Sequence, residues 1–275
     1  MQLKAAIRNR AIAEGIPVRV VMQNYLLERL LERIACSPWR DCVVIKGGML
    51  IASLIGVDKR STKDLDATVR GFSLTHESVE RAFRAIADVE VDDDFSFEFV
   101  RTEEIREADD YPGIRVRLRA RYEKIASVVT VDVTTGDKIT PGAIEFNYPL
   151  MFDDRTLSLM AYPLVTVLSE KLETVICRGT ASTRLRDYYD LYELWSLRGD
   201  ELDRSLLAEA LVATAKRRGT LSLMGRYREV MADVSSDESM RARWAAYAVD
   251  YPYVGDLTLS DACAAVVALM ESAGW

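Results

Sequence analysis

Two aspartates one residue apart, Asp64 and Asp66, have the spacing of a metal-binding pair. They lie in the segment from Lys63 to Val69, where apolar and polar residues alternate as in a β-strand. Successive side chains of a strand point to opposite faces, so both carboxylates should project from the same face. Carboxylate oxygens are the ligands that Mg²⁺ prefers, and paired ions can stabilise the attacking and leaving oxygens of an in-line displacement. The pattern predicts catalytic aspartates that hold Mg²⁺ or Mn²⁺.

A third carboxylate normally completes such a site, and the sequence offers two candidates. Asp132 lies in a β-branched, apolar stretch from Ala126 to Val133, which we predict to be a strand. Asp132 would serve as the third metal ligand if that strand neighbours the Asp64 strand. Asp137, just beyond a predicted turn, is the alternative.

A glycine pair precedes the carboxylates and is typical of a phosphate contact. Cys42 to Ile45 reads as a short buried strand, Gly47 and Gly48 follow Lys46, and a helix is expected from Met49 to Leu54. Glycines let backbone N–H groups approach a ligand closely, and a helix N-terminus favours phosphate. An isolated Asp-x-Asp or Gly-Gly is usually structural. The order strand, Gly-Gly, helix, Asp-x-Asp strand is much more specific and predicts nucleotide transfer from a triphosphate.

Three further polar residues lie just before or within the carboxylate segment. Arg60 and Lys63 could bind phosphate or simply balance local charge. Thr62 lies two residues before Asp64, so its hydroxyl should face the same way and could bond a phosphate or Asp64. Together with Lys46, Gly47 and Gly48, these residues form the predicted nucleotide-binding set.

A stripe of alternating arginines runs along another predicted strand, from Ile114 to Tyr122. All four should project from one face. A solvated outer face, paired with the acidic stretch at 92–94 and with Glu98, would explain them, and so would a track for an RNA backbone. The stripe consists of Arg115, Arg117, Arg119 and Arg121.

These motifs together resemble the DNA polymerase β-type nucleotidyltransferase superfamily and, more narrowly, the AbiEii/AbiGii toxin family. The resemblance covers about residues 5–200. It is carried by the segments VIKGGML at 44–50, RSTKDLD at 60–66, SEKLE at 169–173 and RLRDYYDL at 184–191, and by the helix that ends in YLLERLL at 25–31.

The resemblance implies the toxin of a two-gene toxin–antitoxin or abortive-infection pair. It implies transfer of a nucleotide from a nucleoside triphosphate, with RNA, especially the tRNA 3′ end, as acceptor, and a cognate antitoxin protein as partner. The residues themselves indicate only metal-dependent nucleotide transfer.

Three charged residues in the C-terminal part complete the predicted site. Lys171 borders the apolar stripe of a helix expected at about 163–178, where it must find an anion or extend to solvent. The family resemblance favours a cation on the triphosphate. Asp187 and Asp190 lie near the apolar side of the next helix, where unpaired carboxylates are costly. Either could orient Lys171, bind Arg60 or act as a base, and the sequence does not choose between them.

The elements predict a mixed α/β, or α+β, fold with two lobes. Residues 1–150 should form a nucleotidyltransferase lobe with N-terminal helices and a short mixed sheet. Residues 151–275 should form a helical lobe, with helices at about 163–178, 184–197, 203–217, 221–233, 237–249 and 259–273, and the triphosphate should lie in a cleft between the lobes.

Composition limits the other functions. The single histidine, His76, makes a zinc site or a Ser-His-Asp triad improbable, and four scattered cysteines indicate free thiols. The net charge is −7, although residues 1–60 carry 10 basic and 5 acidic residues, a local excess of +5. No apolar run is long enough to span a membrane, so we expect a cytoplasmic protein. Three other functions compete with nucleotide transfer: a non-catalytic triphosphate-binding module, a phosphotransferase and an interaction protein. The sequence contains neither the usual kinase motifs nor a P-loop, which disfavours the phosphotransferase.

Overall fold

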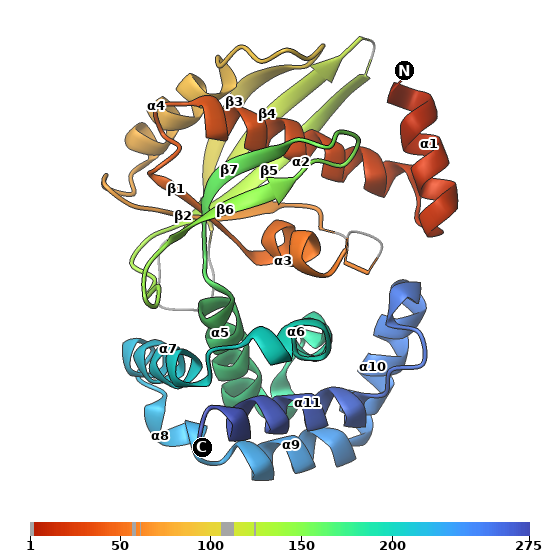
Figure 1. Ribbon diagram of the computed structural model, residues 1–275, viewed down its shortest axis with the longest axis vertical. Coiled ribbons are helices and arrows are strands. Elements are labelled where there is room, and N and C mark those ends of the chain that lie inside the picture. Colours follow the sequence, from red (N-terminus) through yellow and green to blue (C-terminus); the bar gives the residue numbers. More distant parts are fainter. Residues whose placement is uncertain (1–2, 57–58, 61, 106–112, 124) are drawn as a thin grey trace. The chain divides into compact units, whose positions relative to one another are not determined.

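The computed structural model describes residues 3–56, 59–60, 62–105, 113–123 and 125–275. The chain divides into two compact units (Figure 1). Unit 1 comprises residues 1–137 and 143–162. Unit 2 comprises residues 138–142 and 163–275, so the chain passes from unit 1 to unit 2 twice. Each unit is described by itself.

Unit 1 is built on one mixed sheet of seven strands with the order β3-β4-β5-β2-β1-β7-β6. The pairs β2–β5 and β1–β7 are parallel, and the other neighbours are antiparallel. The strands are β1 (Val43–Lys46), β2 (Leu65–Val69), β3 (Ser96–Ile105), β4 (Gly113–Tyr122), β5 (Ile125–Thr134), β6 (Ile144–Pro149) and β7 (Thr156–Ala161).

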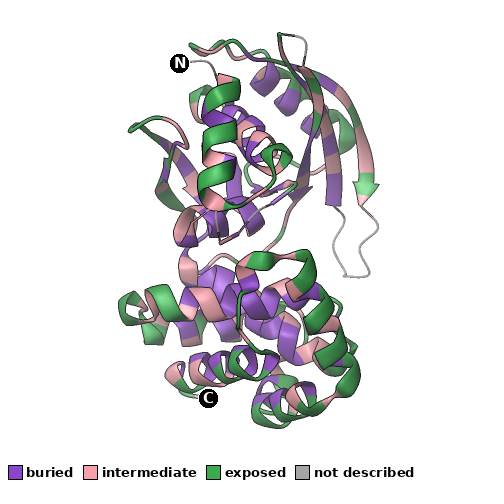
Figure 2. Ribbon diagram, turned by 90° about the vertical axis from the view of Figure 1, so that its right-hand side faces the viewer, coloured by how far each residue is buried: buried purple, intermediate pink, exposed green. Residues whose placement is uncertain are grey.

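Four helices accompany the sheet within the described part of unit 1. They are α1 (Leu3–Glu14), α2 (Val18–Cys36), α3 (Gly47–Ile55) and α4 (His76–Ala87). α2 buries an apolar stripe that includes Leu27, Leu30, Leu31 and Ile34, and Figure 2 shows buried residues concentrated where the helices face the sheet. α4 begins at a capping box in which Thr75 and Ser78 exchange hydrogen bonds, as expected for a helix N-terminus.

Unit 2 is helical throughout its described secondary structure. Its helices are α5 (Leu164–Arg178), α6 (Leu185–Arg198), α7 (Arg204–Arg217), α8 (Leu221–Met224), α9 (Tyr227–Ser236), α10 (Glu238–Asp250) and α11 (Leu259–Ser272), with short 3-10 turns at 179–181, 199–201 and 252–254. Buried apolar residues from α5, α6, α7, α9 and α11 form its core (Figure 2). Asp203, Asp237 and Thr258 cap α7, α10 and α11.

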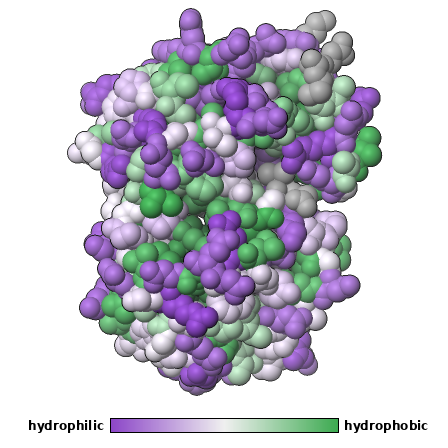
Figure 3. Space-filling model, in the orientation of Figure 1, coloured by the Kyte–Doolittle hydropathy of each residue, from purple (hydrophilic) through white to green (hydrophobic). Residues whose placement is uncertain are grey.

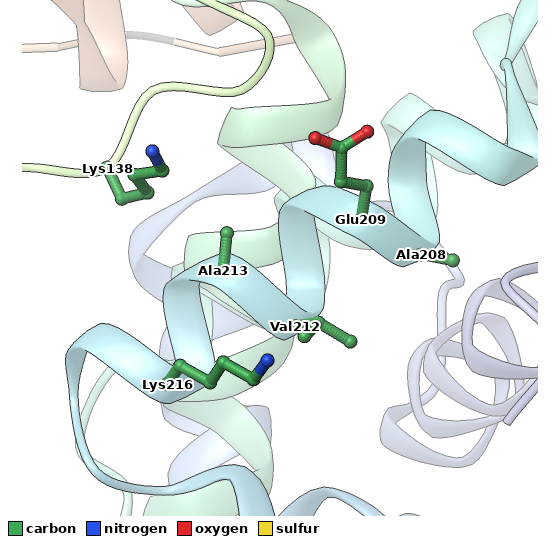
Figure 4. A pocket seen from close by; sticks show the side chains of 6 residues that line it. All are labelled: Lys138, Ala208, Glu209, Val212, Ala213 and Lys216. Atoms are coloured by element: carbon green, nitrogen blue, oxygen red, sulfur yellow. The ribbon is translucent and has the colours of Figure 1, made fainter.

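The surface of α7 carries a shallow pocket of about 570 Å³. Its floor is formed by the small side chains of Ala208, Ala213 and Val212, and Lys138, Glu209 and Lys216 surround it (Figure 4). None of the residues that the sequence assigned to the site lines this pocket. The face shown in Figure 3 mixes hydrophilic and hydrophobic residues on both units. Among the described residues, no helix combines the length and apolar content needed to cross a bilayer.

The sequence-based expectations for the fold are largely confirmed, with three corrections. The segment 141–162 contains strand β7 and the edge strand β6, so the sheet extends past residue 150 and unit 1 ends at Tyr162. The helix expected at 221–233 is two helices, α8 and α9, interrupted at Gly225. The helix expected at Met49–Leu54 is α3, which already begins at Gly47, so the two glycines form its first residues. The four cysteines are free, as expected.

Candidate active site

Four charged residues occupy one row across the middle of the sheet. Lys46 on β1 pairs with Asp66 on β2, Asp66 pairs with Asp132 on β5, and Asp132 pairs with Arg115 on β4. Residues directly opposite one another on neighbouring strands project from the same face. Asp132 can be a third carboxylate of the site only if its strand neighbours that of the Asp64 segment, and the parallel β2–β5 pairing meets this condition. The row places cation, carboxylate, carboxylate and cation side by side.

Asp66 and Asp64 form the acidic centre of this row. Asp66 is the second residue of β2, and Asp64 lies in the bend directly before that strand. Burial raises the pKa of Asp64, and the negative charges of Asp132 and Asp66 add to this effect. Burial also raises the pKa of Asp66, although the Gly48 N–H and the charge of Lys46 oppose it. Like charges are therefore crowded in a partly buried place, an arrangement that a bound cation would relieve.

The two glycines allow α3 to begin directly against these carboxylates. Gly47 has a positive φ of 61°, and a Cβ atom there would lie 2.1 Å from Asp66 Oδ2. A Cβ atom on Gly48 would lie 2.4 Å from Thr62 Oγ1. The Gly48 N–H donates to Asp66 Oδ2 at 3.3 Å. Because any larger residue would collide with the site, both positions require glycine. In this structure the helix N-terminus holds a carboxylate, where the sequence predicted a phosphate.

The residues just before the acidic pair differ in their surroundings. Thr62 is buried, and its hydroxyl donates to the backbone carbonyl of Asp64 at 3.0 Å. Arg60 is buried, and its Nη1 atom would lie 3.1 Å from a Cβ atom on Gly48. Lys63 is exposed, and its carbonyl accepts from Gln23 at 3.0 Å. Arg60 and Thr62 are therefore beside the glycine pair as expected, whereas Lys63 points to solvent. Ser61, which belongs to the same motif, lies outside the described residues.

Asp132 and Asp137, the two candidates for a third carboxylate, differ in their surroundings. Asp132 accepts a bidentate pair of hydrogen bonds from Arg115, at 2.8 and 2.7 Å, which raises the pKa of the arginine. Asp137 Oδ2 accepts from Lys46 Nζ at 2.6 Å and from three hydroxyl groups. Burial alone would raise the pKa of Asp137, but Lys46 and these hydroxyls hold it at about 2. The Oδ2 atom of Asp137 thus already accepts hydrogen bonds from four protein groups. Asp132, by contrast, lies directly beside Asp66 in the row.

The carboxylate oxygens of this row fit a divalent cation that is also bound by the phosphates of a substrate. Within the described ranges, no three His, Cys, Asp or Glu side chains form a ready-made metal cluster. Mg²⁺ is commonly held by one or two protein carboxylates plus substrate phosphates, and it seldom needs a complete protein cage. Asp64 and Asp66 would supply such a partial set, and Asp132 could join it.

The helical residues predicted for the site form an ion cluster within unit 2. Lys171 on α5 donates to Asp187 Oδ1 at 2.5 Å and contacts Asp190 Oδ2 at 2.8 Å, both on α6. The side chain of Asp190 is 0% exposed and that of Lys171 is 14% exposed. Arg184 Nε contacts the other oxygen of Asp187 at 3.0 Å. Both aspartates therefore contact Lys171, and orienting Lys171 is one of the roles that the sequence left open for them.

Comparison with known proteins identifies the family. The model of the Nucleotidyl transferase AbiEii toxin family, of the Type IV toxin–antitoxin systems, matches residues 29–267, which is most of the chain. The chain belongs to the AbiEii toxin family. It is therefore a nucleotidyltransferase of a toxin–antitoxin family. No curated protein matches the chain significantly.

Three solved structures are similar to this chain, and the first of them shows a similar fold. The crystal structure of JHP933 from Helicobacter pylori matches with a TM-score of 0.50 at 13% identity, over 92% of this chain and 90% of that chain. A second H. pylori structure, of a candidate nucleotidyltransferase, has a TM-score of 0.48 at 13% identity and covers 93% of this chain and 95% of its own. An antigenic nucleotidyltransferase-like protein from Paracoccidioides brasiliensis has a TM-score of 0.41 at 17% identity, covering 72% and 92%.

The arginine stripe of this AbiEii protein is paired with acids along its length. Arg117 Nε contacts Glu103 Oε2 at 3.1 Å on β3. Arg119 and Arg121 share Glu98, at 3.3 and 3.4 Å. Arg115 is engaged by Asp132, as described above. Glu98 is the partner that the sequence suggested, whereas Asp93 instead binds Arg33 on α2. The stripe is consequently a mixed-charge surface, on which all four arginines are partly exposed.

Sequence reasoning missed the hydroxyl groups that surround Asp137. Thr68 on β2 lies directly opposite Thr134 on β5, and their hydroxyls are 3.0 Å apart. Tyr162, the last residue of unit 1, reaches the same place: its hydroxyl lies 2.8 Å from Thr68 Oγ1. The sequence carried one usable signal. Thr68 and Asp66 are two residues apart, as are Thr134 and Asp132, so each threonine shares the face of an aspartate in the row.

Proposed function

We propose that this AbiEii protein transfers a nucleoside monophosphate from a nucleoside triphosphate to RNA, with Mg²⁺ or Mn²⁺, at the 3′ end of tRNA. The observation that carries the proposal is the crowded pair Asp64 and Asp66, which adjoins the glycine-based start of α3. Two carboxylates with raised pKa values beside a helix N-terminus suit a cation and a phosphate together.

The reaction is an in-line displacement at phosphorus. The oxygen of an acceptor hydroxyl forms a bond to the α-phosphorus, the bond from that phosphorus to the bridging oxygen breaks, and pyrophosphate leaves with the electron pair. The hydroxyl proton passes to a carboxylate or to water. When bound, the divalent cation would neutralise charge on the phosphates and polarise the reacting oxygens. Asp64 and Asp66 would hold it, and the Gly48 N–H fixes the orientation of Asp66.

The cations of the protein would bind the triphosphate. Arg60 is buried beside the glycine pair and Lys46 occupies the row next to Asp66, so both would stabilise negative charge near the carboxylates. Lys171 is proposed as a further phosphate contact, held in one orientation by Asp187 and Asp190. Between these aspartates, Asp187 is the better candidate for a site residue because its second oxygen meets the half-exposed Arg184, whereas Asp190 is fully buried.

The biological setting follows from the family. The AbiEii assignment supports a toxin role with a cognate antitoxin protein as partner. It also supports action in the cytoplasm, where nucleoside triphosphates and tRNA are available. RNA as acceptor is further supported by the partly exposed Arg117, Arg119 and Arg121, which could exchange their carboxylate partners for phosphates.

A label-transfer assay tests the proposal. Each nucleoside triphosphate, labelled at the α- or the γ-phosphate, is incubated with Mg²⁺, total tRNA and the protein. We expect the α-label, but not the γ-label, to appear on tRNA with one preferred nucleotide. Asp64→Asn should abolish transfer, while Asp41→Asn, at an exposed carboxylate, should leave it unchanged. Transfer of the γ-label would indicate a phosphotransferase instead, and α-label on another acceptor would contradict the assignment to RNA.

A further inference from the structure

The carboxylate of Asp137 links the row of charged residues on the sheet to both points at which the chain leaves unit 1. The chain passes into unit 2 after Asp137, returns at residue 143 and leaves again after Tyr162. Tyr162 OH donates to Asp137 Oδ2 at 2.7 Å, so the last residues before both crossings are hydrogen-bonded to each other. Lys46, at the end of β1, binds the same carboxylate oxygen at 2.6 Å. Asp137 is therefore a shared anchor and not an isolated surface charge.

The anchor lies within the sheet beside the acidic centre. Thr68 is two residues after Asp66 on β2, and Thr134 is two residues after Asp132 on β5. Both threonine hydroxyls contact Asp137 Oδ2, Thr134 at 3.0 Å. The side chain of Asp137 is 11% exposed and that of Lys46 is 16% exposed. A largely buried ion pair with several supporting hydrogen bonds has one favoured geometry, which fixes the ammonium group of Lys46.

We propose that Asp137 is a positioning residue that holds Lys46 in place for the triphosphate, and that it is not a metal ligand. The proposal rests on the proposed function, because it assigns a role to Lys46 in binding the substrate. Two features distinguish it from a general structural role. Four donors from the protein converge on one oxygen of Asp137, which leaves that atom little capacity for a cation. The partner that it orients, Lys46, is directly opposite Asp66 in the row.

The test is a double-mutant cycle on triphosphate binding. Affinity for a fluorescent nucleoside triphosphate is measured for the wild-type chain, Asp137→Asn, Lys46→Met and the double variant, with Ca²⁺ present so that turnover is suppressed. Each single substitution should weaken binding about tenfold, and the double variant should be no weaker than Lys46→Met alone, because Asp137 acts through Lys46. Asp41→Asn, at an exposed aspartate, is the control for the loss of one negative charge elsewhere on the protein.

A second variant and a second titration separate positioning from metal ligation. Tyr162→Phe removes one hydrogen bond to Asp137 without changing its charge, and should weaken triphosphate binding less than Asp137→Asn does. The Mg²⁺ concentration that half-saturates transfer should stay within about twofold for Asp137→Asn. Substitution of a ligand should raise it by at least the roughly 10–100-fold that the loss of an outer-shell partner of a metal ligand can cost.

Two results would overturn the proposal: additive effects in the double variant, or a Mg²⁺ requirement that Asp137→Asn raises as much as Asp64→Asn does. Failure of the proposed function has a different signature. It would show as triphosphate binding by the wild-type chain with no label transferred, and the binding cycle would still report on Lys46 and Asp137.

Discussion

At the scale of single residues, the close approach of Gly47 to Asp66 gives a sharp prediction. Gly47→Ala should reduce transfer by about 100-fold, because a Cβ atom 2.1 Å from Asp66 Oδ2 displaces a carboxylate whose position sets the site. The positive φ of Gly47 adds a stability cost of ~1–2 kcal/mol. Gly225→Ala is the matched control, since that Cβ atom meets nothing within 4 Å. Steady-state transfer and thermal unfolding of both variants provide the measurement. Full activity of Gly47→Ala would show that Asp66 is not required in its present position.

The raised pKa of Asp64 gives a prediction with a definite sign. A carboxyl group with a raised pKa in the folded state binds protons more tightly there than in the unfolded chain, so its ionised form destabilises the metal-free protein above the ordinary pKa of 3.8. Asp64→Asn should therefore raise the Tm of the metal-free protein at pH 7, by roughly 2 °C, and this gain should disappear as the pH falls to about 4.

The same group controls the pH dependence of activity. Because the metal binds the deprotonated carboxylate, wild-type transfer at a subsaturating Mg²⁺ concentration should decline as the pH falls through a value higher than the pKa of an ordinary aspartate. Differential scanning fluorimetry and transfer assays from pH 4 to pH 8 would check both statements. A lower Tm for Asp64→Asn at pH 7 would contradict the like-charge repulsion among Asp64, Asp66 and Asp132.

At the scale of elements, strand β4 carries the testable claim about RNA. Replacing Arg117, Arg119 and Arg121 with Gln should flatten the plot of log affinity for tRNA against log salt by up to about 2 units of slope. Affinity for the triphosphate should not change. The control replaces Arg198, Arg226 and Arg228, which are also surface arginines paired with glutamates. If the two sets of substitutions alter the slope equally, β4 is not a specific RNA contact.

The ion cluster between helices α5 and α6 gives a prediction about the stability of the protein. Asp190→Ala should lower the free energy of unfolding by about 3 kcal/mol, because it leaves the ammonium group of Lys171 short of a fully buried partner. Asp187→Ala should cost clearly less, since the half-exposed Arg184 shows that this side of the cluster reaches solvent. Urea denaturation of the two variants compares them directly, and a larger loss for Asp187→Ala would reverse the assignment of roles.

The elements also show what the sequence could predict. Period-2 alternation identified β2 and β4, a β-branched apolar run identified β5, and helical spacing identified most of unit 2, because each of these elements buries a regular set of side chains. Strand β6, at the edge of the sheet, and its neighbour β7 were not individually predicted from the segment 141–162, since each has only six residues and exposes part of them. Gly225 ends α8 between two helices that share one continuous apolar pattern, so the break was also not evident.

At the scale of the whole molecule, the strand order decides which residues meet. The sequence named Asp64, Asp66 and Asp132, but only the parallel pairing of β2 with β5 brings Asp132 beside Asp66. No local pattern could show that Asp137 binds Lys46, because these residues are 91 positions apart. The division into units was likewise hidden. The return of the chain to unit 1 for residues 143–162 depends on long-range pairing of β7 with β1.

The most direct test of the central claim is the binding of Mn²⁺ with a non-hydrolysable nucleoside triphosphate, followed by electron paramagnetic resonance. The wild-type chain should bind Mn²⁺, Asp66→Asn should bind it roughly 10–100-fold more weakly, and Asp41→Asn should match the wild type. Equal Mn²⁺ affinity in Asp66→Asn and the wild type would contradict the conclusion that this carboxylate pair holds the metal for nucleotide transfer.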